Sequence, residues 1–272
     1  MKVELRGRHD LGDIIGLSYR LYARNFVPFF LIAAITIPLQ LLIGVIQQGS
    51  SGAGAQVASA LLNIPAAIVG LIASAALIVA VHDATGENAP DFGRSLDASF
   101  ERFGTLFTTS LLAGVLAILA LGAAPLLAIY WLARPGATID GERRWWLAVV
   151  PGALAIYLAV RWVLLQQSVM IESRRHWAAL DDSADAVRGS WWRVLGILIV
   201  IALIELGPVS IASAIATPLP PLASAALTSI VLAFVIPFPV TAQTLLYYDL
   251  KARKQADVSA DRLTAAEQDL PG

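Results

Sequence analysis

The sequence predicts an all-α integral membrane protein in which six transmembrane helices form three helical hairpins, each preceded by a short amphipathic interfacial helix. Of the 272 residues, 57% are hydrophobic and only 14% are charged, and the mean hydropathy is +0.71. Soluble domains carry about 25% charged residues. Six apolar stretches reach the roughly 20 residues that a bilayer-spanning helix needs. These stretches are expected to be helices, because a helix satisfies its own backbone hydrogen bonds in lipid. The sequence lacks the short segments of alternating hydrophobicity that are typical of a membrane β-barrel.

The charges between the spans predict the orientation in the membrane. The expected spans are 26–46, 57–81, 103–133, 145–171, 194–216 and 223–248. Of the 19 basic residues, 15 fall on the side of the termini, three fall in 134–144, and Arg161 lies inside a span. Because basic residues stay in the cytoplasm, both termini are expected there, in a multi-pass protein of the cell (plasma or inner) membrane. We expect no cleaved signal peptide.

Three similar segments precede the first, third and fifth spans and suggest a threefold repeat over 11–83, 91–172 and 180–249. Aligned without gaps, Ser18, Ser95 and Ser183 coincide, as do the aromatic residues that follow each by eight positions. These units form a single membrane domain over 1–254, and the polar residues 255–272 are expected to be a disordered cytoplasmic tail. The alternative is that amphipathic linkers in any hairpin protein resemble one another by chance.

Each similar segment is amphipathic at helical spacing, and we call it an elbow helix. In the first, Leu11, Ile15 and Tyr19 share one face, whereas Asp13 and Arg20 share the other. Such a helix lies on the membrane surface, and the chain then turns into a spanning hairpin.

An acidic residue ends each hairpin, at Asp83, Glu172 and Asp249. In the expected topology these carboxylates lie at helix C-termini, where the helix dipole disfavours negative charge. We therefore expect at least two of them to pair with arginines near the elbows, which would join the hairpins into one ring. The candidates are Arg20, Arg24, Arg94, Arg102, Arg188 and Arg193. The alternative is that the acids are solvated loop residues.

Two ionisable residues inside spans form a candidate intramembrane polar site. At a rise of 1.5 Å per residue, Arg161 lies about 16 Å before Glu172, and Glu205 lies about 21 Å after Trp191. Intramembrane charges are paired or functional, so we expect an ion pair that either locks two helices or serves an anionic head group or a proton-coupled step. Gln166 and Gln167 lie nearby in the sequence.

The sequence carries no catalytic or cofactor motif. Cysteine is absent, which excludes disulfides and thiolate chemistry. The glycine-rich residues 49–54 lack the lysine of a phosphate loop, and no basic block suggests nucleic-acid binding. His9, His82 and His176 all fall on the cytoplasmic side, where they are interpreted as interfacial residues, with a weak metal site as the alternative. No cofactor or metal is expected.

Three stretches resemble a known family. LGDIIGLSYRLYARNFVPFF, SWWRVLGIL and TLLYYDLKARK are similar to the bacterial glycerophosphoryl diester phosphodiesterase membrane-domain family, over roughly residues 10–254. The resemblance implies a membrane domain without an established activity, which some members fuse to a catalytic domain. These 272 residues leave no room for that domain, so its activity is not expected here.

The expected function is non-enzymatic handling or sensing of lipid or a small solute, or membrane scaffolding. The alternative is a membrane-embedded enzyme or accessory subunit in phospholipid metabolism. The expected partners are the lipid bilayer and either another membrane protein or further copies of this chain, but not nucleic acid.

The charge asymmetry gives a direct test of topology. Reporter fusions at Ser51, Gly136 and Pro220 should report the outer side of the membrane, because few basic residues flank them. Fusions after Asp91, Asp182 and Lys254 should report the cytoplasm. A cytoplasmic signal at Gly136 would contradict the topology.

Overall fold

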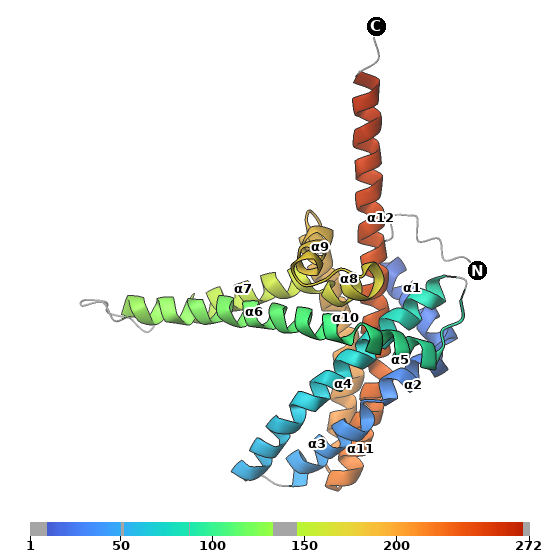
Figure 1. The fold of residues 1–272 in the computed structure, drawn as a ribbon. Helices are drawn as coiled ribbons and strands as arrows, with labels where there is room; N and C mark the ends of the chain where they lie inside the picture. Colours follow the sequence, from blue (N-terminus) through green and yellow to red (C-terminus); the bar gives the residue numbers. More distant parts are fainter. Residues whose placement is uncertain (1–9, 50–51, 87, 133–145, 269–272) are drawn as a thin grey trace.

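The described part of the chain folds into α-helices, which Figure 1 shows from α1 to α12. The computed structural model describes residues 10–49, 52–86, 88–132 and 146–268, and their side chains except at 120–151 and 260–268. No strand occurs in these ranges. The all-helical prediction is confirmed, while His9 and the expected loop at 134–144 lie outside the described residues.

In three successive stretches of the chain, a short helix is followed by two long apolar segments, one of which is broken. The first contains α1 (Leu11–Arg24), α2 (Phe26–Ala34), α3 (Ile37–Gly49) and α4 (Ala53–Thr85). The second contains α5 (Phe92–Glu101), α6 (Phe103–Leu132), α7 (Trp146–Trp162) and α8 (Leu165–Glu172). The third contains α9 (Trp177–Val187), α10 (Trp191–Ala216), α11 (Pro221–Val235) and α12 (Pro237–Gln268). The elbow helices α1, α5 and α9 thus recur in the expected order, although the threefold repeat itself stays a prediction.

The long helices are compatible with a membrane-embedded protein. Four segments are long and apolar enough to cross a bilayer, namely Ala53–Thr85, Gly152–Glu172, Trp191–Ala216 and Pro221–Ser259. Two bent pairs raise the number to six if each pair counts as one span. Helix α2 with α3 is bent by 49°, and α5 with Phe103–Leu119 of α6 is bent by 62°. In Figure 1, α6 and α7 extend to the left, whereas α3, α4, α10 and α11 reach the bottom of the view.

The elbow helices join the three hairpins into a closed ring. Helix α5 packs against α4, and α9 packs against α7 and α8, so each elbow lies on the last part of the hairpin before it. Chain connectivity brings these elements together. Helix α1 has no hairpin before it, and it packs against α12 at the far end of the sequence. We call this arrangement the elbow ring.

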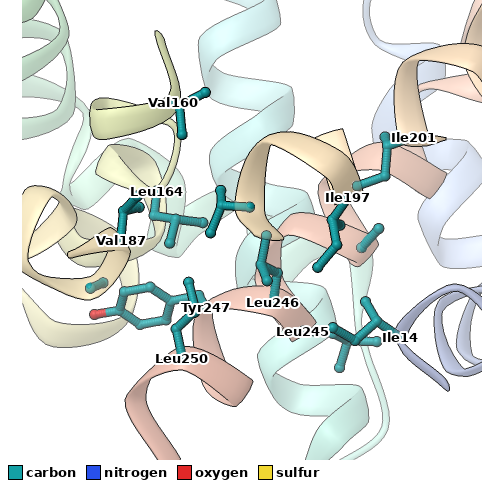
Figure 2. Close-up of a cluster of buried hydrophobic side chains, with 13 residues drawn as sticks. Ile14, Val160, Leu164, Val187, Ile197, Ile201, Leu245, Leu246, Tyr247 and Leu250 are labelled. Atoms are coloured by element: carbon teal, nitrogen blue, oxygen red, sulfur yellow. The ribbon is translucent and has the colours of Figure 1, made fainter. Parts of the chain in front are cut away.

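Buried apolar side chains fill the ring around α4, α8 and α12. One cluster joins α1, α7, α9, α10 and α12, and Figure 2 shows Ile14 of α1 beside Leu245 of α12. A second cluster joins α4, α6, α8 and α9, and a third joins α1, α2 and α4. The core therefore lies at the elbow end of the hairpins, and the far halves of the long helices expose much apolar surface, as in Leu61 of α4 and Leu203 of α10.

The three aligned serines are all fully buried where an elbow meets its neighbour. Ser18, Ser95 and Ser183 have a relative exposure of 0%. The Ser18 hydroxyl donates to the Ile14 carbonyl at 2.6 Å, and the Ser183 hydroxyl donates to the Arg161 carbonyl at 3.1 Å. A small side chain at this position lets the elbow approach the neighbouring helix closely.

The buried face of α1 differs from the expected apolar face. Ile14, Ser18 and Leu21 are buried, whereas Leu11 and Tyr19 are exposed. The helix therefore uses a serine-containing face for packing and leaves Leu11 and Tyr19 exposed.

The C-terminal segment corrects a second expectation. Residues 255–268, expected to belong to a disordered tail, continue α12 as a helix to Gln268. Four alanines and two glutamines occur in this stretch, together with Arg262, Leu263 and Glu267, and these residue types favour helix even without packing.

Packing of α1 in the ring predicts a large difference between two neighbouring substitutions. Ile14→Ala removes buried atoms from the cluster with α12 and should lower the free energy of unfolding by about 2–5 kcal/mol. Leu11→Ala on the same helix, at an exposed position, should change it by less than about 1 kcal/mol. Thermal unfolding in detergent measures both; equal losses would show that α1 does not pack as described.

Candidate functional site

The acid at the end of α4 pairs with an elbow arginine, as expected. An Arg94 guanidinium nitrogen of α5 lies 2.9 Å from a carboxylate oxygen of Asp83. The same guanidinium donates to the Ala89 carbonyl at 2.7 Å, which closes the connection between the two helices. The Arg94 side chain is half exposed, so solvent screens this pair.

The acid in α12 is much more deeply buried. The Asp249 side chain is 1% exposed, and its carboxylate accepts from Arg193 at 2.7 Å and from Arg253 at 2.9 Å. Arg193 belongs to the first turn of α10, and Arg253 lies one turn further along α12. Two of the three hairpin-end acids therefore pair with arginines at or beside an elbow, which confirms that expectation.

The third acid belongs to a cluster centred on a lysine that the sequence analysis missed. The Lys251 ammonium lies 2.8 Å from Glu172 of α8 and 2.5 Å from Asp182 of α9. The Tyr247 hydroxyl also donates to Asp182, at 3.0 Å. Burial alone would raise the pKa of Asp182, but the hydrogen bond and charge of Lys251 lower that pKa below its usual value. Lys251 lies two positions after Asp249 in the sequence. Its closeness to a hairpin-end acid could have predicted a cation near the ends of the hairpins.

Polar contacts link α4, α5, α8, α9 and α12 within the elbow ring. Asp83 with Arg94 joins α4 to α5, and Arg102 at the end of α5 donates to the Met170 carbonyl of α8 at 2.6 Å. Lys251 then joins α8 and α9 to α12. The Tyr248 hydroxyl of α12 and Nδ1 of His82 in α4 are 2.5 Å apart. The charged residues of the hairpin ends are thus engaged in holding helices together.

The expected ion pair between Arg161 and Glu205 is wrong. No ion pair joins them within the part of the chain that the structure describes. The depth of Arg161 was counted along a straight helix, but α7 ends at Trp162 and α8 begins only at Leu165. The break brings Arg161 beside the elbow α9, where its carbonyl accepts from Ser183. Glu205 lies far along the continuous α10.

The two glutamines do not join Arg161 in one polar site. Both lie on α8, beyond the helix break. Gln167 is 1% exposed, and its Oε1 has no hydrogen-bond partner among the described residues, while Gln166 is partly buried. The four residues proposed from the sequence therefore do not form one constellation.

Arg161 instead lines a cavity of about 430 Å³ between α7 and α9. Its guanidinium donates to the Tyr157 hydroxyl at 2.8 Å and lies 5.9 Å from the centre of that ring. Trp162 and Trp177 line the same cavity, together with Asp181 and other residues of α9. No carboxylate of the described residues lies within ion-pair distance of Arg161.

His82 and His176, the two histidines that the structure describes, belong to no metal site there. Within residues 10–49, 52–86, 88–132 and 146–268, no group of three or more His, Cys, Asp or Glu side chains could hold a metal ion. His176 precedes α9, and its backbone N–H donates to the Thr109 hydroxyl at 3.1 Å. No family model, curated protein or solved structure matches this chain.

The two confirmed acid pairs differ in burial and should differ in strength. Asp249→Asn leaves Arg193 and Arg253 without their carboxylate and should cost about 3–5 kcal/mol of stability, as for a broken buried pair. Asp83→Asn breaks a screened pair and should cost no more than about 1 kcal/mol. Unfolding of both variants in the same detergent would show the contrast. A loss at Asp83 as large as that at Asp249 would contradict the assigned burial.

Proposed function

We propose that this chain is a non-enzymatic, multi-pass protein of the cell membrane that binds a phospholipid or a similar amphipathic solute in the Arg161 cavity. In this proposal the three hairpins supply six spans, both termini lie in the cytoplasm, and the elbow ring lies at the cytoplasmic surface. The resemblance to the glycerophosphoryl diester phosphodiesterase membrane-domain family remains part of the proposal.

The observation that carries the proposal is that Arg161 lines a cavity and has no carboxylate of the described residues within ion-pair distance. A partly buried charge needs a partner, because its loss of hydration is costly. Guanidinium groups bind phosphate oxygens through two parallel hydrogen bonds, and they are the residue of choice for that anion. Asp181 lines the same cavity without an ion pair to Arg161, and a lipid phosphate would supply that direct contact.

The aromatic lining supports an amphipathic ligand. Trp162 and Trp177 line the cavity beside Arg161, and Trp177 is largely exposed. Tryptophan rings favour the interface between lipid and water, where one end meets apolar chains and the other meets head groups. An elbow helix on the membrane surface would place this cavity at head-group level.

The charged residues of the elbow ring support a non-enzymatic role. Catalysis by acid and base requires groups that can exchange protons with a substrate. Here Asp83, Asp249 and Glu172 each contact a cation from another helix, which favours a structural use of those carboxylates.

Retained lipid tests the proposal directly. Arg161→Gln keeps a hydrogen-bonding side chain but removes the charge, so it should lower the phospholipid that co-purifies with the full chain about tenfold or more, since a hydrogen bond to a charged group contributes about 1.5–3 kcal/mol. Native mass spectrometry after a fixed detergent wash measures bound lipid per chain.

A matched variant controls for the loss of one positive charge. Arg188→Gln removes an arginine that is 74% exposed and paired only loosely with Asp185, and it should retain lipid as the unmodified chain does. Equal lipid retention by the two variants would overturn the assignment of Arg161.

A further inference from the structure

A second cavity, separate from the one at Arg161, is lined by three arginines. It has a volume of about 240 Å³ and lies between the bend that joins α5 to α6 and the loop that follows α8. Arg102 comes from the bend, and Arg174 and Arg175 come from the loop. Arg102 lies more than 70 positions before Arg174 and Arg175 in the sequence, and all three arginines line the same cavity.

The carboxylates around this cavity do not balance the three positive charges. Glu101 is the one acidic residue in its described lining. Glu172 lies next to the loop, but it contacts Lys251 at 2.8 Å and reaches Arg174 only at 3.5 Å. No ion pair of Arg175 is found among the described residues. The cavity therefore keeps a positive excess.

Other groups in the lining suit an oxyanion as well. The hydroxyl-bearing Thr105 and Ser173 line the cavity, and neither side chain donates a hydrogen bond within the described part of the chain. Arg102 is held in place because one of its nitrogens donates to the Met170 carbonyl, which leaves further N–H groups of its fork for a ligand. The loop is anchored as well, by the bond from the His176 N–H to Thr109.

We infer that this cavity binds a phosphate group. Guanidinium groups match the geometry and charge of phosphate oxygens, and two or more of them converging on one hollow select that anion over a neutral solute. The volume equals that of several water molecules at about 30 Å³ each, so a phosphate group fits. The phosphate can belong to a lipid head group or to a soluble phosphate compound, which share this chemistry. The inference does not depend on lipid binding at Arg161.

Two probes distinguish these sources. The full chain is placed in phosphatidylcholine nanodiscs, and its melting temperature is followed while inorganic phosphate replaces chloride at constant ionic strength, which removes general screening effects. In a second series, phosphatidylglycerol is mixed into the nanodiscs without added phosphate. Stabilisation by inorganic phosphate assigns a soluble ligand, and stabilisation by phosphatidylglycerol alone assigns a lipid head group.

Variants identify the cavity as the origin of either effect. R174Q/R175Q should weaken the apparent affinity for the effective probe at least about tenfold, because hydrogen bonds to a charged group are lost. R188Q, at a distant exposed arginine, should respond as the unmodified chain does. Comparing melting temperatures without probe shows that each variant is folded. The inference is overturned if neither probe stabilises the chain, if R174Q/R175Q responds normally, or if R188Q loses the response equally.

Discussion

Closure of the elbow ring by α1 and α12 is the contact on which the rest of the structure depends. Short connections hold α5 and α9 next to the hairpins that precede them in the sequence. The contact of α1 with α12 is different, because it joins the first and last helices of the chain. Apolar helices in lipid gain little from hydrophobic association, since lipid is as apolar as they are. The described core accordingly lies at the elbow end, where Ile14, Leu245 and Leu246 belong to one buried cluster, and the far halves of the hairpins expose their apolar side chains.

The elbow end of the molecule also carries charged side chains of two kinds. Some form ion pairs between helices, and others line cavities. Carboxylates at helix ends are disfavoured by the helix dipole, and Asp83 and Glu172 offset this through cations on other helices. Asp249 instead lies inside α12, which continues to Gln268, and its buried carboxylate contacts Arg193 and Arg253. Arg161 and Arg175 have no such carboxylate among the described residues, and each lines a cavity. Arg94 and Arg193 contact carboxylates and join helices of the ring, whereas Arg161 and Arg175 are assigned to ligands in the two proposals.

Local patterns in the sequence predicted most of the architecture but not the long-range contacts. Hydropathy and helical spacing predicted the all-helical fold and the three elbows, and alignment of Ser18, Ser95 and Ser183 singled out positions that are all buried. Helix-end electrostatics predicted that Asp83 would contact an arginine. Asp249 also contacts arginines, but the reason expected for it was wrong, because α12 continues past Asp249 to Gln268. The break after Trp162 was missed because no proline or glycine marks it, and this error placed Arg161 too deep. The contact of Lys251 with Asp182 spans 69 positions, and only the packing of α9 against α12 reveals it. The helix through 255–268 was missed because polarity was taken to indicate disorder, although the residues there favour helix.

Disulfide cross-linking in native membranes tests the closed ring most directly, because the chain contains no cysteine of its own. Ile14→Cys combined with Leu245→Cys places two thiols in neighbouring positions of the buried cluster (Figure 2), and a disulfide requires α-carbons within about 7 Å. The ring predicts an intramolecular cross-link on mild oxidation, seen as a mobility shift that a reductant reverses. Ile14→Cys with Leu203→Cys, at an exposed position of α10, should give none. Absence of the first cross-link in folded protein, or equal yields from both pairs, would contradict the packing of α1 against α12.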